Sequence, residues 1–87
     1  MRPMNYAILK VFENGKTFDA EAVMDEIRGE YGGFRAFKKR NVTESLMSAE
    51  KNGLLERSNY DLDDKDELHI YYQATEYGVG MIKKYIK

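Results

Sequence analysis

Helical spacing of apolar residues in the first half of the chain, followed by only two strand-like segments, constrains the fold more than any other feature of this sequence. Helices are predicted over Met4–Glu13, Asp19–Glu30 and Phe37–Asn52. Strands are predicted over Leu54–Tyr60 and Leu68–Ala74, with the polar segment Asp61–Glu67 as the turn between them. Since a last helix follows Thr75, the expected order is three helices, a β-hairpin and a helix.

Residues with known capping preferences mark the ends of these segments. Asp19 stands where the N-cap of the second helix is expected, and Thr75 can cap the last helix. Asn52 and Gly53 end the third helix, because both residue types tolerate a left-handed backbone. Phe18, between the first two helices, either pairs as a brief strand or fills the core.

The chain is too short for a second core. It has 87 residues, and independent domains seldom contain fewer than about 50. Hydrophobic residues make up 43% of it and charged residues 33%, which is a globular composition. No apolar run approaches the ~20 residues that cross a bilayer, so no membrane association is expected. The lack of cysteine and of an apolar leader favours a cytoplasmic protein.

The charges are segregated along the sequence although they nearly cancel overall. The formal net charge is −1, which argues against a general binder of polyanions. Residues 19–30 and 56–67 are rich in Asp and Glu, whereas residues 31–43 contain no acid. The basic side chains of this middle stretch are Arg35, Lys38, Lys39 and Arg40. A basic stretch therefore lies between two acidic ones, at the start of the third predicted helix.

Two motifs resemble those of winged-helix regulators of the PadR and MarR kind. The run Leu-Met-Ser-Ala-Glu-Lys-Asn-Gly-Leu from Leu46 resembles the Leu-x-x-Leu-Glu-x-x-Gly-Leu end of their recognition helix, with Ala49 replacing the second Leu. The run Tyr-Gln-Ala-Thr-Glu-Tyr-Gly from Tyr72 is similar to their Tyr-x-Leu-Thr-x-x-Gly junction after the second wing strand, with Ala74 replacing Leu. Together with the element order, the resemblance covers the whole chain and implies one α+β winged helix-turn-helix domain over residues 1–87.

This resemblance implies a transcriptional regulator that places its third helix in the major groove of double-stranded DNA and needs no catalytic group or cofactor. The cations that would hold phosphates are Arg35, Lys38, Lys39 and Arg40. The outward side chains that would read base edges are Arg40, Asn41, Thr43, Glu44 and Ser48. A solvated helix face is the alternative, but an acid-free stretch on this helix favours nucleic acid.

A homodimer is the expected assembly. Bacterial and archaeal winged-helix regulators commonly dimerise through terminal helices, and a symmetric pair would place two recognition helices one DNA turn apart. The chain has seven tyrosines, more than so thin a core accommodates. The expected interface residues are Tyr6, Ile82, Tyr85 and Ile86. The alternative is that these side chains complete the core of the monomer.

The acidic turn between the strands opposes DNA binding by the wing. Here a single lysine, Lys65, is surrounded by five acids, which are Asp61, Asp63, Asp64, Asp66 and Glu67. Either the third helix alone contacts DNA, or the domain is a protein-interaction module that does not bind DNA directly. In the second case the acidic wing and the acidic second helix would bind a basic partner. The sequence leaves both alternatives open.

The types and spacing of residues disfavour four other kinds of site. Gly29, Gly32 and Gly33 follow no strand and precede no Gly-Lys-Ser/Thr, so a phosphate loop is not indicated. The acidic turn fails the calcium-loop pattern, because Tyr72 stands where a Glu is required. His69 is the only histidine, so no metal site is expected and no chemistry is assigned to it. No motif indicates an activated nucleophile, so an enzyme is not expected.

Overall fold

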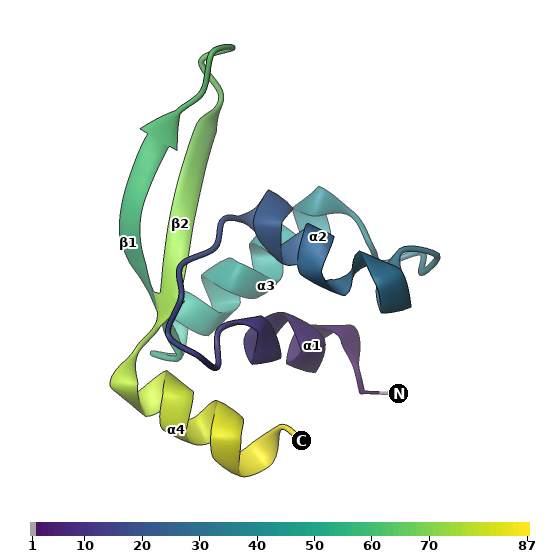
Figure 1. The fold of residues 1–87 in the computed structure, drawn as a ribbon, viewed down its shortest axis with the longest axis vertical. Coiled ribbons are helices and arrows are strands. Elements are labelled where there is room, and N and C mark those ends of the chain that lie inside the picture. The colour runs from purple at the N-terminus through teal and green to yellow at the C-terminus, as the bar shows by residue number, and fades with distance from the viewer. Residues whose placement is uncertain (1) are drawn as a thin grey trace.

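The computed structural model describes residues 2–87 and shows a group of helices from which a two-stranded hairpin, the wing, projects (Figure 1). The helices are α1 (Met4–Val11), α2 (Ala20–Tyr31), α3 (Lys39–Lys51) and α4 (Glu76–Tyr85), and the strands are β1 (Leu55–Leu62) and β2 (Leu68–Ala74). This order confirms the predicted α+β winged-helix arrangement. Within residues 2–87, no helix combines the length and apolar character needed to cross a bilayer.

The first and third helices are shorter than predicted. The first ends at Val11 because the chain turns at Phe12, whose side chain is fully buried. The third begins at Lys39 instead of Phe37, since Lys38 has an extended backbone with φ −136° and ψ 145°. Gly53, at φ +79°, then ends α3 in the left-handed conformation that glycine adopts without strain. The basic stretch is therefore divided between a loop and the first turn of α3.

The predicted cap of the second helix is confirmed. Asp19 is the N-cap residue, and its carboxylate accepts a hydrogen bond of 2.9 Å from the amide of Ala22. The preceding residue, Phe18, both pairs with Tyr72 of β2 in an isolated bridge and packs against the core. The start of α2 is therefore tied to the edge of the wing.

A single apolar core lies where α1, α2, α3, the base of the wing and α4 meet. Each helix contributes the side chains on one face, as the apolar spacing predicts. The largest fully buried side chains are Ile8, Phe12, Val23, Tyr31, Val42, Leu46, Leu55 and Ile82. Tyr31 carries a hydroxyl into this region and donates it to the carbonyl of Arg2. The core thus seats α3 by one face and leaves its opposite face exposed.

The two strands pair in antiparallel fashion and contain one irregularity. The register pairs Leu55 with Ala74 at the base and Leu62 with Leu68 at the far end, with a shift between Arg57 and Asn59. The extra residue in this β-bulge reverses the alternation of β1, so that residues beyond it point to the other face. Figure 1 shows the hairpin rising from its base beside α4, with its turn at the end farthest from α4.

The junction between the wing and α4 explains the second sequence motif. Thr75 caps α4 by accepting a hydrogen bond of 2.8 Å from the amide of Gly78, and its hydroxyl donates to the carbonyl of Gly53 at 2.6 Å. A Cβ atom at Gly78 would lie 1.9 Å from the carbonyl oxygen of Leu54. The motif therefore needs glycine because the helix and the chain leaving α3 touch through their backbones.

Candidate nucleic-acid interface

The basic side chains at the start of α3 differ in how free they are to meet an anion. Arg35, Lys38 and Arg40 are exposed, and none of them forms an ion pair within residues 2–87. Lys39 is also exposed, but its ammonium lies 2.9 Å from a carboxylate oxygen of Glu21 on α2. The hydrogen bond with Glu21 raises the pKa of Lys39 and keeps it charged. Lys39 is therefore a paired cation, whereas its three neighbours are unpaired.

The backbone adds to this positive end. The N-cap residue of α3, Lys38, makes no side-chain capping bond, and the first turn contains no acidic residue. The first amides of a helix lack intrahelical partners, and the helix dipole is positive at this end. Together with the exposed cations, the N-terminus of α3 is suited to an anion such as a phosphate.

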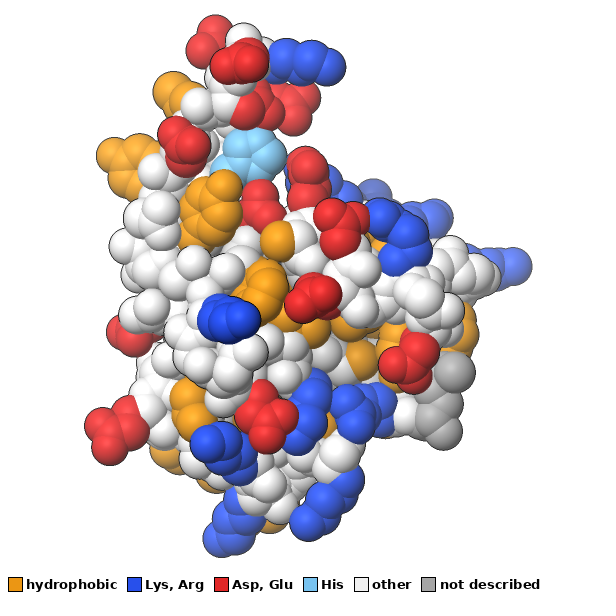
Figure 2. Space-filling model, in the orientation of Figure 1, with side chains coloured by type: hydrophobic (Ala, Val, Ile, Leu, Met, Phe, Trp, Pro, Cys, Tyr) orange, Lys and Arg blue, Asp and Glu red, His pale blue; other side chains and the backbone are white. Residues whose placement is uncertain are grey.

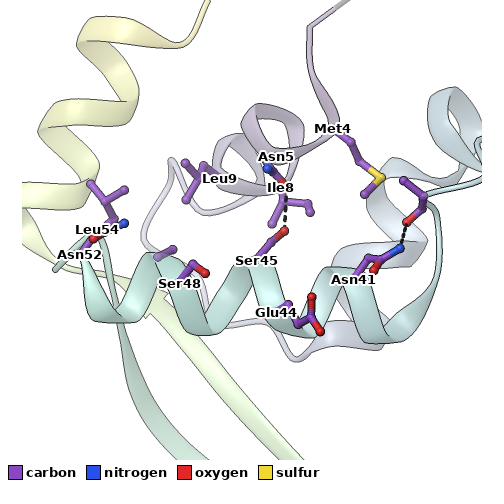
Figure 3. A pocket seen from close by; sticks show the side chains of 12 residues that line it. Met4, Asn5, Ile8, Leu9, Asn41, Glu44, Ser45, Ser48, Asn52 and Leu54 are labelled. Atoms are coloured by element: carbon purple, nitrogen blue, oxygen red, sulfur yellow. Dashed lines mark hydrogen bonds between the residues drawn. The ribbon is translucent and has the colours of Figure 1, made fainter.

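Three of the residues predicted to read bases, Asn41, Glu44 and Ser48, line the side of α3 that faces α1. All three border a groove of about 440 Å³ between these helices (Figure 3). The side-chain amide of Asn41 donates to the carbonyl of Ala36 at 3.0 Å and is half-buried. Asn41 therefore holds the loop before α3. Its side-chain amide, which would recognise a base, is already hydrogen-bonded to that loop.

The other predicted residues lie on two further sides of α3. Thr43 is half-buried and lines a cleft of about 280 Å³ between α3 and the wing. Arg40 is exposed on the outward face, and Glu44, one turn further along, is exposed at the border between this face and the α1 groove. Helical spacing adds to the outward face Met47 and Lys51, both exposed, which the sequence-based set omitted although the pattern i, i+7 and i+11 from Arg40 could have found them.

The base of the wing is fastened to α3. Arg57 on β1 forms an ion pair of 3.0 Å with Glu50 on α3, and its guanidinium lies over the ring of Tyr72 at 6.0 Å from the centroid. Of the two basic residues in the acidic segment 56–67, Arg57 is thus already paired. The wing consequently offers little positive charge to a phosphate backbone.

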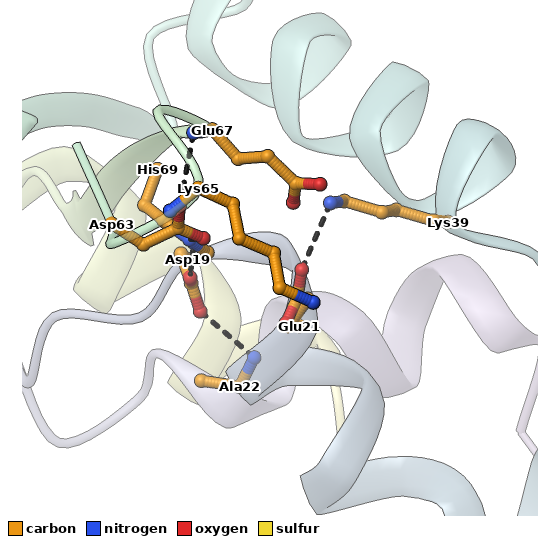
Figure 4. Close-up of polar contacts among 8 residues, drawn as sticks. All are labelled: Asp19, Glu21, Ala22, Lys39, Asp63, Lys65, Glu67 and His69. Carbon is orange, nitrogen blue, oxygen red and sulfur yellow. Dashed lines mark hydrogen bonds and ion pairs between the residues drawn. The ribbon is translucent and has the colours of Figure 1, made fainter. Parts of the chain in front are cut away.

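His69 has a role that its isolation in the sequence did not indicate. Its Nδ1 lies 2.8 Å from Asp19 at the start of α2, and its Nε2 lies 2.9 Å from Asp63 in the wing turn (Figure 4). A neutral imidazole has a single N–H, so both contacts are hydrogen bonds only when the ring is protonated. The bonds to Asp63 and Asp19 raise the pKa of His69.

Asp63 organises the wing turn through the same carboxylate. One oxygen accepts hydrogen bonds from the amides of Lys65 and Glu67, at 2.8 Å and 2.9 Å, while the other contacts His69. The bond to His69 and the two backbone amides lower the pKa of Asp63. We call Asp19, Asp63 and His69 the histidine clamp, since they join the turn of the wing to the N-terminus of α2.

The tip of the wing remains acidic despite the clamp. Asp64, Asp66 and Glu67 are exposed, and Figure 2 shows acidic side chains gathered there. Phosphates and this tip repel each other, so the wing is unsuited to close contact with a nucleic-acid backbone. Among the described residues, no three His, Cys, Asp or Glu side chains are placed to hold a metal ion.

Of the residues predicted to form a dimer interface, two lie in the core of the monomer. Ile82 is 1% exposed and Ile86 is 6% exposed, so the assignment of these two side chains to an interface needs correction. They are buried because α4 turns that face onto α1 and the chain leaving α3. Tyr6 and Tyr85 are exposed at the rim of an apolar groove of about 260 Å³ between α1 and α4.

Three helices, the third of which has an exposed outer face, are followed by a hairpin wing. This arrangement defines a winged helix-turn-helix domain. The solved structure of Bacillus subtilis PadR in complex with operator DNA is similar over 99% of this chain, with a TM-score of 0.77 and 18% identity. A PadR-like transcriptional regulator from Bacillus cereus is similar over 93% of the chain, with a TM-score of 0.69 and 14% identity.

The chain spans 48% of the length of the first of these proteins and 75% of the second. No protein-family model and no curated protein matches the sequence. The structures therefore confirm the PadR-like winged-helix fold that the two sequence motifs predicted.

Proposed function

We propose that this protein is a DNA-binding transcriptional regulator that places α3 in the major groove of double-stranded DNA, without enzymatic activity or a cofactor. The observation that carries the proposal is the group of exposed, unpaired cations, Arg35, Lys38 and Arg40, at the unobstructed positive end of α3. One of the proteins with a similar fold is PadR, solved in complex with operator DNA, which supports the same use of the fold here.

The side chains of α3 have different proposed roles. Arg35 and Lys38 bind phosphates, and Arg40, Glu44 and Thr43 face base edges. Lys39 contributes less than its neighbours, because a phosphate must first displace Glu21. On the α1 side, Asn41 holds the loop before α3, and Ser48 borders the DNA contact.

Binding to duplex DNA over a series of salt concentrations tests this proposal. Lys38→Ala should weaken binding to all sequences and reduce the slope of log affinity against log salt by about one unit, as expected for one lost phosphate contact. Lys83→Ala on α4 is the matched control, since it removes one exposed lysine that lines neither the α1–α4 groove nor α3 and should leave the slope unchanged. Equal salt slopes for both variants and the unaltered protein would contradict the proposal.

We further propose that the DNA-binding form is a homodimer joined along the groove between α1 and α4. Tyr6 is 50% exposed and Tyr85 is 61% exposed, and both border this apolar groove. Replacing both tyrosines by serine should shift the sedimentation coefficient toward that of a monomer, while the circular dichroism spectrum is retained. A monomeric unaltered protein at concentrations that saturate DNA would refute the dimer.

A further inference from the structure

An apolar surface continues from the core along one face of the wing. Cross-strand pairs share a face, so Tyr60 lies beside Ile70 and Leu62 beside Leu68. Three of these side chains are exposed, at 75% for Tyr60, 58% for Leu62 and 55% for Leu68. We call Tyr60, Leu62, Leu68 and Ile70 the wing patch. It contrasts with the opposite face of the distal wing, where Asp61 pairs with His69.

The β-bulge creates this patch. Leu55 and Arg57 lie on the same face as Tyr72, whose side chain is buried in the core. Strict alternation beyond Arg57 would bring Asn59 and Asp61 to that face. The extra residue instead brings Tyr60 and Leu62 there, opposite the apolar residues of β2. Without the bulge, β1 would place polar residues on this face of the distal wing. The exposed apolar face is therefore a specific consequence of the bulge.

The patch is hollowed, and its far end adjoins a tip in which acids outnumber the single lysine, Lys65. A depression of about 450 Å³ is lined on one side by Tyr60, Leu68 and Ile70 and on the other by Arg57, Ser58 and Asn59 at the bulge. The exposed acids of the tip adjoin its far end, and Arg57 at the near end is neutralised by Glu50. A concave apolar surface with a charged border is typical of protein-binding sites.

Charge decides which occupant fits. DNA is excluded from the distal wing because the acidic tip repels phosphates. A second copy of the wing would bring two acidic tips together, which opposes a symmetric contact through this face. A cationic protein segment with apolar side chains satisfies both the acidic border and the apolar floor.

We propose that the wing patch is a docking site for a basic protein segment that inserts apolar side chains between Tyr60, Leu68 and Ile70. Leu68 and Ile70 also line the cleft that contains the paired Lys39, but the unpaired cations Arg35, Lys38 and Arg40 line neither this cleft nor the depression of the patch. A docking site there gives the acidic wing a role that the winged-helix fold does not require.

Peptide titrations monitored by amide chemical shifts of the full chain test the proposal. The probes are a short peptide of alternating lysine and leucine, one with serine in place of leucine, and one with glutamate in place of lysine. The lysine–leucine peptide should shift amides between residues 56 and 71, and the other two should bind at least about tenfold more weakly, because each lacks one of the required contacts.

Variants of the chain locate the contact. Leu62→Ser with Leu68→Ser should weaken binding of the lysine–leucine peptide by at least about tenfold. Both positions are exposed, so folding is expected to survive, and Tyr77→Ser, at a residue 59% exposed on α4, is the control for loss of an exposed apolar side chain. Unchanged affinity in the wing variant, or equal binding of the lysine–serine peptide, would overturn the proposal.

The same variants separate this proposal from DNA binding. The wing variant removes no charge, so its salt slope for duplex DNA should equal that of the unaltered protein, and Arg40→Ala should bind the lysine–leucine peptide normally. Peptide shifts centred on the acidic residues of α2 or on the α1–α4 groove would place the contact elsewhere and reject the wing patch, whatever the DNA measurements show.

Discussion

The Oδ2 atom of Asp19 lies 2.8 Å from Nδ1 of His69, while Oδ1 of the same carboxylate caps α2 at 2.9 Å from the amide of Ala22. One side chain thus starts a helix and holds the wing to it. Because α2 packs against α3, this contact also relates the position of the wing to the helix proposed to bind DNA.

The first prediction concerns the protonation of His69. An NMR titration should give His69 a pKa above 6.5, since both ring nitrogens donate to carboxylates. Asp63→Asn should lower that pKa by removing the charge from one partner. Asp64→Asn, at an exposed neighbouring acid, should leave it nearly unchanged. A pKa at or below 6.5 in the unaltered protein would contradict the protonated clamp.

The second prediction is a window of pH in which the clamp stabilises the fold. The raised pKa of His69 means that its contribution is complete below about 6.5, its unfolded value, and is lost as pH rises through the folded value. The lowered pKa of Asp63 means that its contribution is present above about 3.9 and is lost as pH falls through its folded value.

The free energy of unfolding of the unaltered protein should therefore exceed that of His69→Gln most clearly between about pH 4 and pH 6.5. Urea denaturation at a series of pH values measures this difference. The difference should shrink toward alkaline pH, and a difference that grows there instead would show that the sign of the coupling is wrong.

The third prediction separates the two roles of Asp19. Asparagine caps helices about as well as aspartate but carries no charge. Asp19→Asn should therefore lower the pKa of His69 while retaining the start of α2. Asp19→Ala should lower it too and should cost about 0.5–2 kcal/mol more in unfolding free energy, because the cap is also lost. Equal stability of the two variants would show that the cap contributes little.

The fourth prediction compares two glycines of α4. Gly78→Ala should destabilise the protein by at least about 2 kcal/mol, because its Cβ would overlap the carbonyl of Leu54. Gly80→Ala meets no atom within 4 Å and should stabilise α4 by roughly 0.5–1 kcal/mol through helix propensity. Thermal denaturation of both variants measures these changes in stability. An unchanged melting temperature for Gly78→Ala would mean that α4 and the chain at Leu54 are less closely packed than the structure shows.

Local features of the fold could be read from the sequence because they depend on neighbouring residues. The caps at Asp19 and Thr75 are confirmed, since each bonds an amide three residues along the chain. The strand in which Leu68, Ile70 and Tyr72 alternate with His69, Tyr71 and Gln73 is also confirmed. Helix boundaries were less accurate because burial of Phe12 and the extended backbone at Lys38 arise from the surrounding structure.

The roles of individual site residues were harder to predict. Lys39 is paired with Glu21, 18 residues away, and Asn41 is engaged by the loop before α3. The bulge in β1 moved Tyr60 and Leu62 to the face that alternation assigns to Asn59 and Asp61. None of these outcomes follows from the spacing of residue types alone.

The sequence by itself determined the element order, the caps and the basic character of the start of α3, because periodicity and capping bonds act within a few residues. Only the tertiary structure decided which cations are free, that Ile82 and Ile86 belong to the core, and that His69 joins two carboxylates, one of them 50 residues away. The reason is physical: burial and ion pairing depend on which distant segments meet, and the packing of the helices against the wing brings those segments together.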